Sequence, residues 1–149
     1  MSVKDLLYKF CVDAIEQKLS TIHSVLNSAQ DSANHETKST AGDKHDTARA
    51  MAHLESEKNA NQLAEINKLK KVLPYLKDHH AKTEVDLGCV VKTNFANYYI
   101  SISLGKTTVK NEDYFTISAV TPIGKLLVGK KVGDSFVFNG KTIQITSIF

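Results

Sequence analysis

The sequence predicts an α+β protein in which a helical hairpin precedes a small β domain. Apolar residues in the first half recur at helical spacing, whereas those in the second half alternate as in strands. The period changes in a polar segment at residues 79–84, which predicts a coiled-coil hairpin over 1–80 and a β domain over 85–149. A length of 149 residues accommodates these parts and excludes a large multidomain enzyme.

The first helix is predicted over residues 4–38, because apolar residues follow each other at alternating spacings of four and three. This stripe consists of Tyr8, Val12, Ile15, Leu19, Ile22, Leu26, Ala29 and Ala33. A turn signal at 39–43 precedes a second helix, predicted from 44 to about 78 and kinked or ended early by Pro74. Similar lengths and a short connection favour an antiparallel hairpin, about 50 Å long at ~1.5 Å per residue.

The second half is predicted to form an antiparallel sheet with one short helix. Alternating apolar residues indicate strands at 85–91, 98–104 and 115–119. Asn139-Gly140, between strands at 135–138 and 141–148, predicts a closing hairpin, because both central residues of a type I′ turn need positive φ. Thr121, Pro122 and Gly129 suit the N-cap, the first position and the end of a short helix.

Composition and charge exclude several functional classes. A net charge of +3 and a single arginine, Arg49, give little basis for a DNA-binding surface. No run approaches the ~18 apolar residues of a membrane span, and the N-terminus lacks the apolar region of a secretory signal, so a cytoplasmic protein is expected. Cys11 and Cys89 lie far apart in sequence, which favours free buried thiols over a disulfide.

The segment 117–134 contains Thr-Pro-Ile-Gly-Lys-Leu-Leu-Val-Gly-Lys at 121–130. It resembles the C-terminal signature of the Gre transcript-cleavage factors of bacterial RNA polymerase, with Thr121 in place of the usual serine. The resemblance extends over essentially the whole chain, because that family begins with a long antiparallel coiled coil that carries an acidic tip motif. Gly42, Asp43 and Asp46 correspond to the glycine and the two acidic residues of this tip.

The resemblance implies an FKBP-like C-terminal domain that docks on RNA polymerase and a coiled coil that reaches along the secondary channel of the enzyme. The polymerase-binding residues would be Thr121, Pro122, Ile123, Gly124 and Lys125. Asp43 and Asp46 would be the catalytic carboxylates, and would bind Mg²⁺ only transiently, within the polymerase active centre. The chain is thus expected to be a monomeric accessory factor, not an enzyme, without a stably bound cofactor and in contact with nascent RNA and DNA only through the elongation complex.

Other interpretations of the same residues stay open. Asp43 and Asp46, spaced i and i+3 at a helix start, are also typical of a capping box. Thr47, Arg49 and Ala50 differ from the Asn, acidic and Tyr residues of the family's tip, which favours as an alternative a secondary-channel regulator without cleavage activity. A peptidyl-prolyl isomerase is suggested by the FKBP-like fold alone, and fold does not imply function. A coiled-coil adaptor for unrelated partners is a further alternative.

Overall fold

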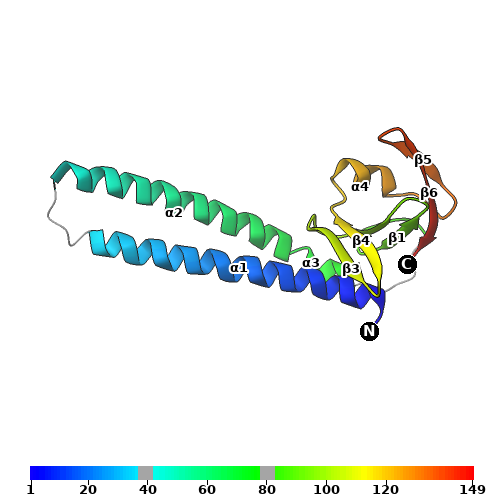
Figure 1. Cartoon of the computed structure of the whole chain (residues 1–149), viewed down its shortest axis with the longest axis horizontal. Coiled ribbons are helices and arrows are strands. Elements are labelled where there is room, and N and C mark those ends of the chain that lie inside the picture. Colours follow the sequence, from blue (N-terminus) through cyan, green and yellow to red (C-terminus); the bar gives the residue numbers. More distant parts are fainter. Residues whose placement is uncertain (37–41, 78–82) are drawn as a thin grey trace. The chain divides into compact units, whose positions relative to one another are not determined.

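The structure is a computed structural model of the 149-residue chain. It describes residues 1–36, 42–77 and 83–149, with side chains for all of these except 29–36 and 42–52. The protein is α+β, as predicted: a long N-terminal helix and a second helix precede a six-stranded mixed sheet (Figure 1). None of the described helices is long and apolar enough to cross a membrane.

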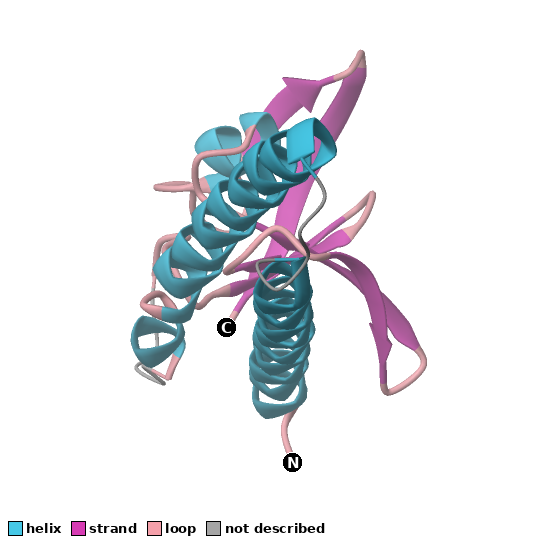
Figure 2. Ribbon diagram, turned by 90° about the vertical axis from the view of Figure 1, so that its left-hand side faces the viewer, coloured by secondary structure: helices cyan, strands magenta, loops and turns pink. Residues whose placement is uncertain are grey.

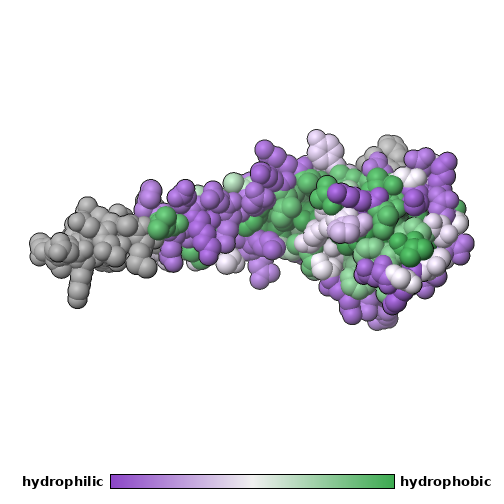
Figure 3. All heavy atoms as spheres, turned by 90° about the horizontal axis from the view of Figure 1, so that it is seen from above, coloured by the Kyte–Doolittle hydropathy of each residue, from purple (hydrophilic) through white to green (hydrophobic). Residues whose placement is uncertain are grey.

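The chain divides into two compact units. One consists of Met1–Ala14 together with Lys71–Phe149, and the other of Ile15–Lys70. The first 14 residues therefore belong with the strands, whereas the sequence analysis places them in the hairpin. Polar side chains predominate on the described surface of the helical unit, while apolar residues reach the surface at several places on the unit with the strands (Figure 3).

The long helices begin and end close to their predicted positions, with one exception. Helix α1 spans Val3–Glu36 and helix α2 spans Gly42–Lys70, so α2 ends earlier than predicted. Pro74 lies in the first turn of a separate short helix, α3, at Leu73–Leu76. The prediction that Pro74 ends the second helix early is thus confirmed, because proline lacks the N–H that a continuous helix needs.

The N-terminus of α1 is fixed by a capping box. Ser2 Oγ accepts the N–H of Asp5 at 3.1 Å, and Asp5 Oδ2 accepts the N–H of Ser2 at 3.2 Å. Both bonds satisfy donors that the helix itself leaves unpaired. The start of α1 is therefore encoded locally, by two side chains three residues apart.

The buried stripe of α1 differs from the predicted one over its first turns. Leu7, Cys11, Ile15 and Ile22 are buried, whereas Tyr8 and Val12 are half-buried. Because a straight helix has 3.6 residues per turn, its buried face drifts relative to a strict heptad repeat. In addition, the first turns belong to the unit with the strands, so the sheet rather than a partner helix selects their buried face.

The sheet has six strands in the order β3-β4-β2-β1-β6-β5. Their bounds are β1 Val90–Thr93, β2 Asn97–Ile100, β3 Gly105–Val109, β4 Glu112–Ile117, β5 Ser135–Phe138 and β6 Lys141–Ile148. The prediction of an antiparallel sheet is wrong at one pair, since β2 and β4 are parallel. The cause is β3, which reverses the chain after β2 and pairs with the outer edge of β4. The sheet is strongly twisted, so its two terminal hairpins point in different directions (Figure 2).

Two-residue turns close both terminal hairpins. Asn139 and Gly140 connect β5 to β6 with φ of 52° and 76°, which confirms the predicted type I′ turn. Lys110 and Asn111 connect β3 to β4 with φ of 49° and 65°. The sequence analysis missed this second hairpin, because the turn contains no glycine and Val109 is the single aliphatic side chain of β3.

One face of the sheet covers a compact apolar cluster. Its buried members are Val85, Cys89, Val91, Tyr98, Ile100, Leu127 and Ile145. The predicted strand at 85–91 starts only at Val90, and 85–89 contains turns instead. The alternating apolar side chains of 85–91 nevertheless belong to this cluster or pack against it. The short helix α4, at Pro122–Leu127, contributes Leu127 to this cluster.

The opposite face of the sheet is covered by the first turns of α1. Strand alternation places Tyr99 on the side opposite to Tyr98 and Ile100, and Tyr99 is fully buried there. Burial raises the pKa of the Tyr99 hydroxyl well above its ordinary value, and the neighbouring Cys11 and Tyr8 add to this effect. The Cys11 thiol contacts Ser101 Oγ at 3.7 Å, and burial raises its pKa as well. Both cysteines are free and buried, as predicted.

The packing of α1 on the sheet gives a stability prediction. Leu7→Ala should lower the free energy of unfolding by about 2 to 5 kcal/mol, because Leu7 is fully buried and the change leaves a cavity. Leu54→Ala on α2 is the matched control: Leu54 is 63% exposed, so a change within about 0.5 kcal/mol is expected. Urea unfolding of both variants measures the difference, and equal losses would contradict the assigned core.

Candidate functional site

The residues of the predicted docking segment form the junction between β4 and α4, and residues 118–125 are called the signature loop. Thr121 is the N-cap of α4: its Oγ1 accepts the N–H of Gly124 at 3.2 Å and donates to the main-chain oxygen of Ser118 at 2.7 Å. Pro122 occupies the first turn of α4. The predicted cap and proline position are confirmed, and both fix the direction in which the helix leaves the sheet.

Gly124 allows a close approach that no other residue permits. A Cβ added at this position would lie 2.1 Å from the main-chain oxygen of Ser118 and 3.1 Å from the carbonyl carbon of Ala119. Both neighbours are backbone atoms, which cannot turn aside as a side chain can. The first turn of α4 therefore packs directly on the end of the strand segment.

The five predicted polymerase-binding residues divide into two groups. Thr121 and Ile123 are half-buried and Gly124 is buried, so these three hold the loop in place. Pro122 and Lys125 are exposed and face solvent. Val120, which precedes the Thr121 cap, is a further apolar residue on the surface, with 75% of its area exposed. The sequence analysis missed Val120, although the alternation of Ile117 and Ala119 places it on the outer face.

The predicted tip residues lie in the first turn of α2. This helix begins at Gly42, so Asp43 is its second residue and Asp46 its fifth. The spacing of Asp43 and Asp46 places both on one side of the helix. Their side chains are outside the described residues. Among the side chains that the structure describes, no three histidine, cysteine, aspartate or glutamate residues come together as a metal site.

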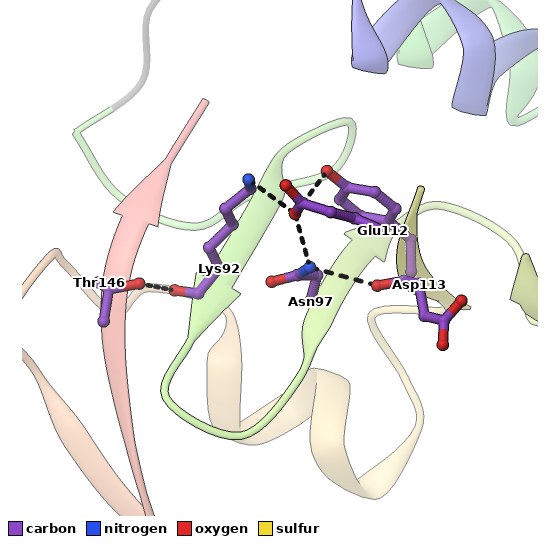
Figure 4. A network of polar contacts seen from close by, with 6 residues as sticks. Lys92, Asn97, Glu112, Asp113 and Thr146 are labelled. Carbon is purple, nitrogen blue, oxygen red and sulfur yellow. Dashed lines mark hydrogen bonds and ion pairs between the residues drawn. The ribbon is translucent and has the colours of Figure 1, made fainter. Parts of the chain in front are cut away.

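A polar network connects β1, β2 and β4 at the end of the sheet where β2 and β4 begin (Figure 4). Glu112 Oε2 accepts hydrogen bonds from Lys92 Nζ at 3.0 Å, Asn97 Nδ2 at 3.3 Å and the Tyr114 hydroxyl at 3.5 Å. Asn97 Nδ2 also donates to the main-chain oxygen of Asp113 at 3.2 Å. The bond from Lys92 lowers the pKa of the Glu112 carboxyl, and the same bond raises the pKa of Lys92.

No sequence signal indicates this network. Lys92 and Glu112 are 20 residues apart, and each reads as an ordinary charge on the solvent side of a strand. Strands β1 and β4 are the two neighbours of β2 in the sheet, so the long side chains of Lys92 and Glu112 reach each other across β2.

Comparisons with protein-family models, with curated proteins and with solved structures gave no match to this chain.

The close approach at Gly124 gives a second stability prediction. Gly124→Ala should lower the free energy of unfolding by about 1 to 3 kcal/mol, because the added methyl group forces α4 away from Ser118. Lys125→Ala is the matched control at the adjacent exposed position, with an expected change within about 0.5 kcal/mol. Thermal or urea unfolding compares the two. A stable Gly124→Ala variant would show that the loop accommodates a side chain and that the contact is not required.

The network around Glu112 gives a prediction about pH. The Glu112 carboxyl should titrate below the ordinary glutamate value of 4.5, and Lys92→Met should raise its pKa toward that value. Since the folded pKa is the lower one, the contribution of this group to stability is complete above the unfolded value and is lost as the pH falls through the folded one. Carboxyl-carbon NMR titration measures both proteins. An unchanged pKa in Lys92→Met would contradict the role of Lys92.

Proposed function

We propose that this protein is an accessory factor of RNA polymerase that stimulates cleavage of backtracked RNA. The observation that carries the proposal is the segment 117–134, which resembles the Gre signature in residue type and order. In the structure this segment runs through the end of β4, the Thr121 cap, α4 and the turn before β5. This order of a strand, a capped helix and a turn supports the proposal.

The arrangement of the helices is part of the same proposal. We propose that α1 and α2 pair as an antiparallel hairpin and that the strands form an FKBP-like domain. Helix α1 has 34 residues, about 50 Å at ~1.5 Å per residue, which suits an arm that enters a channel. The chain would act as a monomer and meet nascent RNA and DNA only inside the elongation complex.

Docking would use the exposed part of the signature loop. Val120, Pro122 and Lys125 face solvent, while the Thr121 cap and the Gly124 contact keep the loop in one conformation. A surface that is already ordered loses little conformational entropy on binding. The partner is RNA polymerase.

The chemistry would belong to the tip. Phosphodiester hydrolysis by two metal ions needs hard oxygen ligands for the ion that orients water, and Mg²⁺ commonly takes only one or two carboxylates from one source. Asp43 and Asp46, one helical turn apart in α2, would supply such oxygens to an Mg²⁺ ion of the polymerase. The protein itself would hold no cofactor and would not be an enzyme.

A second candidate is a regulator that occupies the secondary channel without stimulating cleavage. The observation that favours it is the replacement of three family tip residues by Thr47, Arg49 and Ala50. Arg49 adds a positive charge where the family has an acidic residue, which would weaken binding of a cation nearby.

The tip prediction separates these two functions. Asp43→Asn should reduce stimulated cleavage of backtracked RNA at least tenfold, roughly 1.4 kcal/mol of transition-state stabilisation, because an amide binds Mg²⁺ poorly. Polymerase binding should not change, and stability should change by less than about 1 kcal/mol, the usual effect of a charge at a helix start. Asp46→Asn should behave likewise, while Glu57→Gln, an exposed carboxylate farther along α2, should have no effect.

Two outcomes would contradict the proposal in different ways. Wild-type activity of Asp43→Asn would exclude the metal role of this carboxylate. Polymerase binding by the wild-type protein without any stimulated cleavage would support the channel-occupying regulator instead.

A further inference from the structure

The loop between β1 and β2 holds an aromatic side chain outward. Thr93 Oγ1 accepts the N–H groups of Phe95 at 3.1 Å and Ala96 at 2.9 Å. Asn94 ties the loop to β6, since its Oδ1 accepts the N–H of Gln144 at 2.8 Å and its own N–H donates to the Gln144 oxygen at 3.1 Å. Phe95 nevertheless stays 55% exposed. A large aromatic side chain on a well-ordered loop is typical of an anchor for a binding partner.

Phe95 borders a pocket of about 330 Å³. Phe115, 38% exposed on β4, and Ala96 complete its apolar part. Phe115 is itself supported by Tyr98, with ring centroids 6.1 Å apart. The volume is near the lower end for small-molecule sites, so the pocket suits one side chain better than a large ligand.

The charged part of the pocket consists of Lys106 and Asp113. Glu112 precedes Asp113 on β4, so its carboxylate lies on the opposite face of the sheet, where it accepts a hydrogen bond from Lys92. A hydrogen bond from Thr108 lowers the pKa of the Asp113 carboxyl, so this carboxyl is negative at neutral pH. Lys106 Nζ lies 3.4 Å from Asp113 Oδ2, and both side chains are more than half exposed. Such an exposed ion pair contributes only about 0 to 1 kcal/mol, so another cation can replace Lys106.

The aromatic part already attracts a cation of this chain. Lys141 Nζ lies 4.2 Å from the centroid of the Phe95 ring. The negative faces of aromatic rings favour such a position, and arginine occupies it more often than lysine.

We propose that this pocket binds an arginine side chain of a partner protein. A planar guanidinium stacks on an aromatic ring and donates parallel hydrogen bonds to a carboxylate, and the pocket offers both groups. A phosphate or a nucleotide suits it less, because the Asp113 carboxylate lines the pocket and its lysine, Lys106, is paired with that carboxylate.

This site is separate from the signature loop. Asn97 lies beside Tyr114 at the start of the parallel pair, and Ile100 lies beside Ile117 at its end. The pocket lies at the start and the signature loop follows the end. The inference therefore does not rest on the proposed function in transcription.

Titration of the full-length protein with N-acetyl-arginine amide, monitored by NMR of the backbone amides, tests the proposal. The signals of Phe95, Ala96 and Phe115 should shift saturably, with a Kd on the order of 1 to 10 mM for a single side chain. The citrulline analogue has the same shape without the charge and should bind at least fivefold more weakly. Asp113→Asn should weaken arginine binding at least threefold, while Glu57→Gln on α2 should leave it unchanged.

Three results would overturn the proposal. They are shifts that rise linearly without saturation, equal binding of the arginine and citrulline compounds, and saturable binding of AMP at the same residues with equal or higher affinity. The comparison of arginine with citrulline uses the wild-type protein, so it stands even if Asp113→Asn folds poorly.

Discussion

Strand β2 is buried on both faces, and this constraint governs the rest of the unit that contains the sheet. Tyr98 and Ile100 face the cluster that includes Leu127 of α4, while Tyr99 is fully buried on the other side. Each face of such a strand must be covered. Helix α4 and residues 85–89 cover one face, and Met1–Ala14 covers the other. The start of the long helix is therefore part of the β unit's core.

Covering the second face has a cost that the packing offsets. Among the residues that the structure describes, the Tyr99 hydroxyl has no hydrogen-bond partner although it is buried. An unpaired buried hydroxyl costs roughly 1 to 3 kcal/mol. Burial of the Tyr99 ring and of other apolar side chains of the same unit, such as Leu7, offsets this cost, because each Å² of apolar surface removed from water contributes ~25 cal/mol.

Signals within a few residues of each other predicted some elements correctly, but other elements depend on contacts between distant parts of the chain. Asn139-Gly140 and Thr121-Pro122 act within a few residues, so their turn and cap could be predicted. The parallel pairing of β2 with β4 depends on where β3 lies, and β3 has little apolar pattern of its own. The same limit applies to the sites. The signature loop is contiguous, whereas the pocket needs Phe95 from the loop between β1 and β2 and Phe115 from β4, with Asn94 bonded to Gln144, 50 positions away.

The residues of the signature loop differ in what they contribute to folding. Thr121 caps α4 and Gly124 permits contact with Ser118, so the fold alone requires these two residue types at this junction. A match to a family at such positions is therefore evidence for a shared strand-to-helix junction, and is weaker evidence for a shared binding partner. Val120 and Lys125 have no comparable structural role and are exposed, whereas Pro122, also exposed, occupies the first turn of α4. If docking uses this loop as proposed, substitutions at Val120 and Lys125 would change binding without changing folding, whereas substitutions at Thr121 and Gly124 would change folding as well.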